Sequence, residues 1–248
     1  MAILTQFVLR LSFGLALGMA LTNPRQVTSG YYRNHLYVLL GLTVLATLVA
    51  FGARDQFALA PPLAAATVSY VGSVAWLYEK PRAGVVLLWL VAGLTLWGAW
   101  ADTQFDSAAS PAALALAWLD PPTSGLVLGL TMAAMFLGHW YLNSPTMALG
   151  PLQRLVVLMA AAIVQRMVVE AGRLTLILSA GTPTTEDCLF LALRWLSGLL
   201  GALGLAGMTW QTLKIPNTQS ATGILYVAVI VTFLGELIAL LMAAQGGY

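Results

Sequence analysis

The fold of this chain is decided by one uninterrupted apolar stretch between Leu152 and Gly181, which reads LQRLVVLMAAAIVQRMVVEAGRLTLILSAG. It contains no proline, and at about 1.5 Å of helical rise per residue it is longer than the roughly 30 Å hydrocarbon core of a bilayer requires. We therefore expect a membrane-spanning helix over about 152–180. Arg154 lies close enough to its start to reach the membrane interface.

The charged residues further along this stretch cannot all reach an interface. Arg166, Glu170 and Arg173 are spaced by four and three residues, so they share one face of the helix, and Glu170 can pair with either arginine. A charged side chain costs at least about 2.5–3.5 kcal/mol at the centre of a membrane. We therefore expect this face, with the neighbouring Gln165, to point into a helical bundle or a water-filled cavity, and we take it as the candidate site.

The composition extends this interpretation to the whole chain. Of 248 residues, 60% are hydrophobic and 8% are charged, which is more apolar surface than a soluble domain of this size can bury. We therefore expect an all-α, polytopic integral membrane protein, in which residues 1–248 form a single transmembrane helical bundle. Eight apolar segments separated by turn-rich loops predict the spans at approximately 2–22, 36–53, 63–78, 85–101, 125–142, 152–180, 188–210 and 222–245.

The loop between the fourth and fifth predicted spans, Asp102 to Ser124, is the longest. Its acidic and proline residues are Asp102, Asp106, Pro111, Asp120, Pro121 and Pro122. They bracket a short apolar run, 112–119, which is too short to cross a bilayer. We therefore interpret this run as an interfacial or re-entrant helix.

Basic residues indicate the orientation in the membrane. The first, third, fifth and seventh loops hold Arg25, Arg33, Lys80, Arg82, Arg154 and Lys214, whereas the opposite loops hold only Arg54. The positive-inside rule places the four basic loops in the cytoplasm and both termini on the outer face of the cell membrane, which requires an even number of spans. No short charged leader with a cleavage site precedes the first apolar run, so we expect no removable signal peptide.

Charged side chains form a layer in this topology. Counting residues from the predicted helix ends places six of them in the middle and outer half of the membrane, namely Arg10, Arg166, Glu170, Arg173, Arg194 and Glu236. Pairing each carboxylate with one arginine leaves two positive charges that require water, a backbone or quinone carbonyl, a lipid phosphate, a further carboxylate or a neighbouring subunit. Glu236 has no basic neighbour in sequence, so it needs a tertiary partner or a protonated carboxyl group.

An alternative interpretation of the layer needs no site. Arg10, Arg173 and Arg194 would extend their side chains to the outer interface. Arg166 and Glu170 would then form an ordinary structural pair within one helix.

A second cluster, His139, Trp140 and Tyr141, lies at the cytoplasmic end of the fifth predicted span. Aromatic residues at a helix end are typical of an interfacial belt. Together with His35, which lies on the same side, His139 would allow bis-histidine haem ligation, although two histidines are a minimal signal and we do not expect haem b. The cluster also offers a histidine donor and a flat wall for a quinone headgroup.

Glycine and tryptophan spacing predicts helix packing. Gly14 and Gly18 allow close approach of the first helix to a neighbour. Glycines at every third position, Gly198, Gly201, Gly204 and Gly207, predict that the seventh helix is central or docks another subunit. Trp89 and Trp97 predict a peripheral fourth helix.

Several chemistries are not supported by the sequence. Cys188 is the single cysteine, which excludes an internal disulfide and a cysteine-ligated metal site, and we predict no metal site. The formal net charge of +2 does not indicate nucleic-acid binding. No glycine-rich phosphate loop or hydrolase motif occurs, so we expect no catalysis by this chain alone.

Three functions remain open. The first is an integral membrane subunit of a redox or energy-conserving complex, whose charged layer binds a quinone or transfers protons, with other membrane or peripheral subunits as partners besides the lipid bilayer. The second is a small transporter or lipid-handling protein for an anionic substrate. The sequence has no convincing internal repeat, which counts against a transporter because many transporters contain such repeats. The third is a scaffold or assembly subunit without a site of its own.

Overall fold

The predicted all-α, multi-pass bundle is confirmed in a computed structural model that describes residues 2–53, 56–103, 110–144, 146–181, 184–215 and 217–245. Arg54 and Asp106, which entered the sequence interpretation, lie outside these described residues. Eight helical segments are long and apolar enough to cross a membrane, with α7, η1 and α8 forming one span. The helices are α1 (Ala2–Leu21), α2 (Ser29–Gly52), α3 (Gln56–Leu77), α4 (Pro81–Ala101), α5 (Pro111–Asn143), α6 (Gly150–Ala180), α7 (Thr185–Leu193), the π-helical segment η1 (Arg194–Gly201), α8 (Ala202–Lys214) and α9 (Thr218–Ala244).

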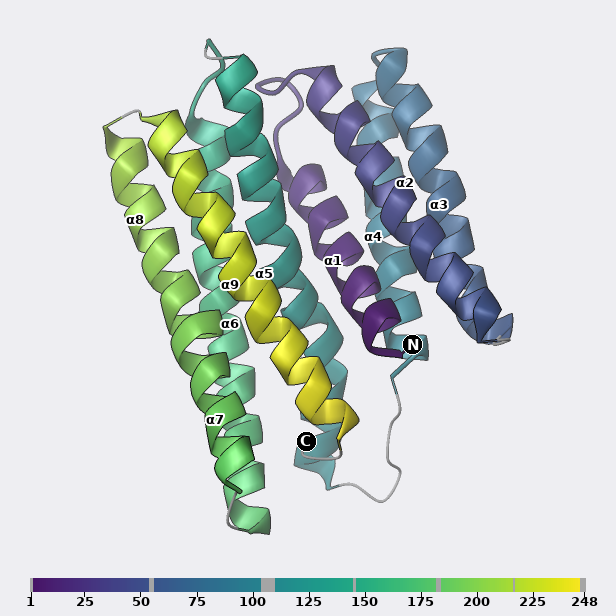
Figure 1. Ribbon diagram of the computed structural model, residues 1–248. Coiled ribbons are helices and arrows are strands. Elements are labelled where there is room, and N and C mark those ends of the chain that lie inside the picture. The colour runs from purple at the N-terminus through teal and green to yellow at the C-terminus, as the bar shows by residue number, and fades with distance from the viewer. Residues whose placement is uncertain are drawn as a thin grey trace.

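Successive spans run in opposite directions, so α1 begins and α9 finishes at the same end of the bundle (Figure 1). We call this the terminal end. The opposite end carries the loops and helix starts that contain Arg25, Arg33, Lys80, Arg82, Arg154 and Lys214, and we call it the basic end. The even number of candidate spans agrees with this arrangement.

α1 lies between two groups of helices. It contacts α2 and α4 on one side and α5 and α9 on the other, and it therefore joins α1–α4 to α5–α9 (Figure 1). Its apolar side chains are accordingly among the most buried of the molecule, with Leu15, Ala16 and Met19 fully enclosed. Polar residues on α1 are thus held against several helices at once.

Glycines bring α1 and α5 into backbone contact. A Cβ atom on Gly14 would lie 1.8 Å from the carbonyl oxygen of Gly125, and one on Gly129 would lie 1.9 Å from the carbonyl carbon of Gly14. A Cβ atom on Gly18 would lie 2.8 Å from that of Ala133. The predicted close approach at Gly14 and Gly18 is therefore confirmed. We call this contact the glycine seam.

The prediction of a loop with a short interfacial helix before the fifth span is wrong. Residues 112–119 belong to α5, which continues through Pro121 and Pro122 as one helix to Asn143. Pro122 lacks the N–H group that would bind the carbonyl of Trp118 in a regular helix, but the indole Nε1 of Trp100 donates to that carbonyl over 3.1 Å. Partners from a neighbouring helix make such prolines tolerable in a membrane span.

The seventh span, α7–η1–α8, is not central as one reading of its glycines predicted. α7 has no buried residue, and a Cβ atom on Gly204 or Gly207 would meet nothing within 4 Å. Gly198 is the exception, because a Cβ atom there would lie 2.7 Å from the Cα atom of Gly235 on α9. The seventh span therefore packs on α9 through both η1 and α8, and α8 also contacts α6, while Gly204 and Gly207 lie on the exposed side.

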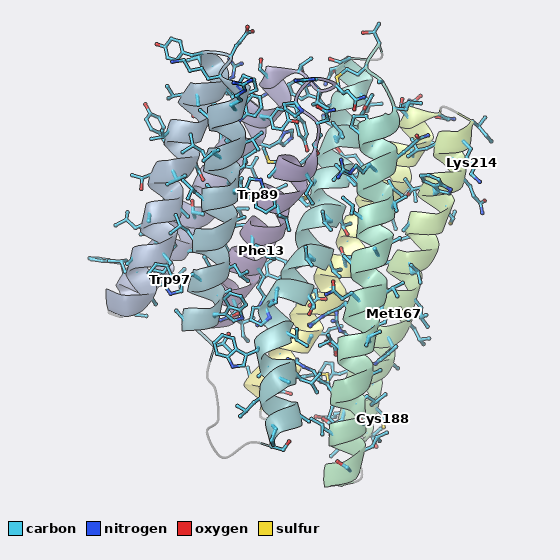
Figure 2. All side chains as sticks on the ribbon, turned by 180° about the vertical axis from the view of Figure 1, so that it is seen from behind. Phe13, Trp89, Trp97, Met167, Cys188 and Lys214 are labelled. Carbon is cyan, nitrogen blue, oxygen red and sulfur yellow. The ribbon has the colours of Figure 1, made fainter. Side chains whose placement is uncertain are left out.

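The peripheral position of α4 is confirmed. Trp89 and Trp97 project from its outer surface (Figure 2) and are 48% and 56% exposed, whereas Leu88 and Thr95 on the opposite face are buried. A lipid-facing apolar surface of this kind is expected of a membrane span. The polar site must therefore lie on the other side of α4, in the middle of the bundle.

Candidate functional site

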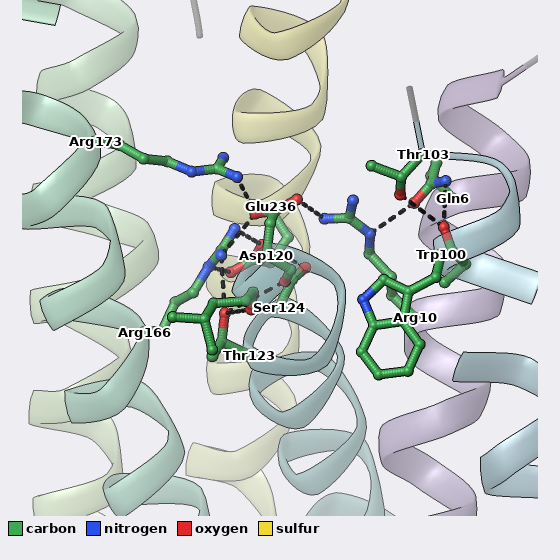
Figure 3. A network of polar contacts seen from close by, with 12 residues as sticks. Gln6, Arg10, Trp100, Thr103, Asp120, Thr123, Ser124, Arg166, Arg173 and Glu236 are labelled. Atoms are coloured by element: carbon green, nitrogen blue, oxygen red, sulfur yellow. Dashed lines mark hydrogen bonds and ion pairs between the residues drawn. The ribbon is translucent and has the colours of Figure 1, made fainter. Parts of the chain in front are cut away.

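A network of seven charged side chains lies inside the bundle, towards its terminal end. Figure 3 shows the part formed by Arg10, Asp120, Arg166, Arg173 and Glu236. Five spans contribute the seven side chains: Arg10 from α1, Asp120 from α5, Arg166, Glu170 and Arg173 from α6, Arg194 from η1 and Glu236 from α9. We call this set the charge network. It unites the six charges that the sequence placed in one layer and adds a seventh, Asp120.

Glu236 has the tertiary partners that its sequence neighbourhood lacks. Arg166 binds it with two nitrogens, Nε donating to Oε1 over 3.3 Å and Nη2 to Oε2 over 3.1 Å. Arg194 Nη2 donates to Oε1 over 2.9 Å, and Ser124 Oγ donates to Oε2 over 2.7 Å. Hydrogen-bond donors and positively charged groups therefore surround both carboxylate oxygens.

Glu170 pairs with arginines on two spans. Its Oε1 lies 3.0 Å from Arg166 Nη2, one helical turn away, and it accepts a hydrogen bond of 3.2 Å from Arg194 Nη2. The predicted pairing within α6 is therefore confirmed. Arg194 Nη2 is shared between Glu170 and Glu236, so α6, η1 and α9 are joined at one nitrogen.

Asp120 is the residue that the sequence interpretation missed. Its Oδ2 lies 2.6 Å from Arg10 Nη1, and its Oδ1 lies 2.8 Å from Arg166 Nη1 and 3.0 Å from Arg173 Nη2. Arg166 Nη1 also donates to Thr123 Oγ1 over 3.1 Å. One carboxylate therefore holds three arginines from α1 and α6.

A sequence signal for Asp120 did exist. The apolar run 112–119 and the predicted span 125–142 together form one long segment in which Asp120 is the only charged residue. Reading Pro121 and Pro122 as helix breakers hid this continuity, although prolines occur within membrane helices. A lone acid inside a long apolar segment is a functional-site hypothesis by default.

The network continues towards the terminal end through Gln6. Arg10 Nε donates to Gln6 Oε1 over 2.9 Å. The Gln6 amide nitrogen in turn donates to the carbonyl of Ala99 over 2.9 Å and to Asp102 Oδ2 over 3.2 Å. A connected polar chain thus runs from the end of α4 to the middle of the bundle.

Burial decides against the alternative in which the arginines extend to the interface. Arg194 and Arg166 are fully buried and Arg10 is 4% exposed. Arg173 is the most open arginine of the network, and its side chain contacts Asp120. Asp120 supplies a carboxylate of the kind that the expected surplus of positive charge required, and it reduces the excess within the network from two to one.

Arg194 keeps donors that no described residue satisfies. Its Nε and Nη1 atoms are buried and have no hydrogen-bond partner within the described chain. Arg194 begins η1, and its Nη1 lies 3.3 Å from the position that a Cβ atom on Gly235 would occupy. Buried donors of this kind are rare in folded proteins, and π-helical segments are frequent at functional sites.

Gln165 does not belong to the site, contrary to the sequence interpretation. It is exposed on the outside of α6, whereas Arg166 is fully buried. Consecutive residues on an α-helix point about 100° apart, so adjacency to Arg166 in sequence does not place Gln165 on the same face.

The second predicted cluster, His139 with Trp140 and Tyr141, spreads its contacts over different neighbours at the basic end. His139 Nδ1 lies 3.1 Å from the Tyr226 hydroxyl, and Trp140 Nε1 donates to Thr28 Oγ1 over 2.9 Å. Tyr141 donates to the carbonyl of Ala148. These contacts are typical of residues that fix helix ends.

His35 lies beside the same stretch of α5, with its ring centroid 6.2 Å from that of Trp140. Its Nδ1 lies 2.6 Å from the carbonyl oxygen of Tyr31, and its ring lies 4.4 Å from that of Phe136. Haem ligation by His35 and His139 would require both rings to leave their present partners. Among the described residues, no group of three or more His, Cys, Asp or Glu side chains is placed to hold a metal ion.

The charge network is therefore the candidate functional site. It is polar, buried and assembled from distant parts of the sequence, and its chemistry consists of carboxylates, guanidinium groups and hydroxyls. Comparison with known protein families, characterised proteins and solved structures finds no match to this chain.

Proposed function

We propose that this chain is an integral membrane subunit of a redox or energy-conserving complex, in which the charge network transfers protons. The observation that carries the proposal is the continuous polar chain from Asp102 through Gln6, Arg10, Asp120 and Arg166 to Glu236. Intramembrane carboxylates and arginines are costly, and they commonly mark proton relays or ion pathways.

Stability alone is a weak reason for such a network. Replacing buried ion pairs with apolar residues is often neutral or stabilising, because desolvation offsets much of the attraction between the charges. A proton that binds Asp120 or Glu236 would weaken its hold on Arg166, and the change would pass to the other carboxylate through the same guanidinium group. This coupling links the protonation of groups on α5 and α9.

We place the terminal end on the outer face of the membrane. The basic loops gather at the opposite end, which the positive-inside rule assigns to the cytoplasm (Figure 1). In this orientation the polar chain approaches the outer face, and protons would enter or leave there. A cytoplasm-specific reporter should be active when fused after Arg82 or Lys214 and silent at Tyr248; activity at Tyr248 would reverse the orientation.

A quinone is a second candidate ligand, favoured by Arg194. Its Nε and Nη1 atoms lack acceptors within the described chain. A quinone carbonyl is an acceptor that can enter from the lipid, and neighbouring carboxylates could then exchange protons with the bound quinol. Mass spectrometry of the natively purified complex would identify both a bound quinone and the partner subunits.

Two variants test proton transfer. Glu236→Gln keeps the size of the side chain and one accepting oxygen while removing its ionisation. In proteoliposomes that contain the assembled complex, we expect proton flux to fall about 100-fold or more. This is the lower end of the range expected for the loss of one acid–base group. Glu186→Gln, the same change at an exposed position on α7, is the matched control and should leave the flux unchanged.

The double variant Arg166→Leu/Glu170→Met separates a relay from a structural pair. Asp120 would still contact Arg10 and Arg173, and Glu236 would still contact Arg194, so no carboxylate is left without a partner. The protein should assemble but lose proton flux. Full proton flux in both this variant and Glu236→Gln would contradict the relay and support a scaffold subunit without a site of its own.

A further inference from the structure

We propose that Arg10, Arg166 and Arg173 form a binding site for a small carboxylate anion, which the side chain of Asp120 occupies in this structure. The three guanidinium groups lie 2.6, 2.8 and 3.0 Å from its two oxygens. Arginine presents planar donors that match a carboxylate, and it remains charged in a buried setting. The proposal concerns anion binding and does not depend on proton transfer.

The charge balance favours an additional anion. Four arginines and three carboxylates make up the charge network, so one positive charge is in excess. Glu170 and Glu236 are each held by Arg166 and Arg194. Arg10, in contrast, takes its network ion pair from Asp120 within the described residues, so it would bind an incoming carboxylate without leaving Glu170 or Glu236.

The same part of the network is also the most accessible. The side chains of Asp120 and Arg173 are 11% and 13% exposed, whereas those of Arg166, Arg194 and Glu236 are fully buried. An anion that enters from the terminal end would therefore meet the edge formed by Asp120 and Arg173 before it met the deeper carboxylates.

The backbone after Asp120 lacks two helical N–H donors, although the Thr123 hydroxyl binds the carbonyls of Leu119 and Asp120. Pro121 and Pro122 follow it directly, and neither can donate a helical hydrogen bond to the preceding turn. The carbonyl of Trp118 is held instead by the side chain of Trp100. A residue before proline also disfavours helical backbone angles. Asp120 can therefore withdraw at this point with less loss of backbone hydrogen bonding than within a regular helix.

Formate is the probe, because it is the smallest carboxylate and fits where the Asp120 carboxylate lies. Thermal unfolding of the purified full chain is followed in sodium formate and in sodium chloride at equal ionic strength. Formate should raise the midpoint more than chloride, because a ligand that binds only the folded state stabilises it. In Asp120→Asn, half-saturation should occur at a formate concentration at least about tenfold lower, since the tethered competitor is gone.

Two control variants identify the site. Asp187→Asn makes the same change in the first turn of α7, where Asp187 belongs to the capping box with Thr184 and lies outside the charge network, and its formate response should equal that of the wild type. The double variant Asp120→Asn/Arg173→Gln should lose most of the response gained by Asp120→Asn, because one of the three arginines is absent.

The outcomes are decisive in each case. Equal effects of formate and chloride on Asp120→Asn, or equal responses of Asp120→Asn and Asp187→Asn, would show that Asp120 is only a structural counter-charge. If Asp120→Asn is not recovered folded in chloride, its recovery in formate supports the site. Failure to recover it in either salt overturns the proposal.

Discussion

The two ends of the bundle interior are held together by different interactions. Towards the terminal end, seven charged side chains from five spans form ion pairs. Towards the basic end, aromatic rings pack instead: Tyr32 stacks on Trp76 with ring centroids 4.0 Å apart and planes 6° apart, and Tyr31 is fully buried beside them. The interior at the basic end is therefore filled by rings without charge.

The two ends differ in how far the effect of a single substitution should extend. Aromatic packing tolerates changes of similar shape, whereas each charge of the network depends on partners from other spans. A substitution at the aromatic end should therefore remove only the contacts of the substituted side chain. A substitution in the charge network should leave charges elsewhere without partners.

The largest effect is expected at the glycine seam, on which both regions depend. Gly129→Leu would drive a side chain into the backbone of α1, because even a Cβ atom there lies 1.9 Å from the Gly14 carbonyl carbon. We expect no folded protein, measured by size-exclusion chromatography in detergent. Gly41→Leu, at a helical position with nothing within 4 Å, is the control and should fold normally. If both variants fold, the close backbone contact of α1 and α5 at the glycine seam is contradicted.

The next effect is expected for Arg166→Leu alone. It removes a partner from Asp120, Glu170 and Glu236 at once, and breaking a buried ion pair from one side costs about 3–5 kcal/mol. Unfolding in denaturant should show this loss. Adding Glu170→Met should recover much of it, because the double change removes a positive and a negative charge together. Equal losses in the single and double variants would show that packing, not charge, dominates at this end.

A smaller effect is expected for Tyr32→Phe at the aromatic end. The change keeps the ring that stacks on Trp76 and removes the hydroxyl that donates to the carbonyl of Thr22 over 2.9 Å. The loss should be about 0.5–1.5 kcal/mol, the net value of one hydrogen bond. Proton flux should not change. A loss as large as that of Arg166→Leu would remove the contrast between the two ends.

The smallest effect is expected for Gln165→Leu, beside Arg166 in sequence but on the outer surface of α6. The free energy of unfolding should change by no more than about 0.5 kcal/mol, as is usual for surface substitutions. Proton flux and the formate response should equal those of the wild type. A loss of proton flux or of the formate response would show that Gln165 belongs to the functional site.

The sequence by itself determined the class of the protein, the number of spans, the shared face of Arg166 and Glu170, and the close approach of α1 at Gly14. These follow from length, hydropathy and spacing along one helix, which are local properties. The tertiary structure decided which charges meet. Asp120 enters the charge network only because α5 continues through two prolines, with Trp100 of α4 binding a carbonyl that the prolines leave free. Arg194 meets Glu236 because Gly198 and Gly235 let η1 and α9 touch. Contacts between spans depend on how helices are aligned against one another, and that alignment is set by all the packed surfaces together rather than by any one segment.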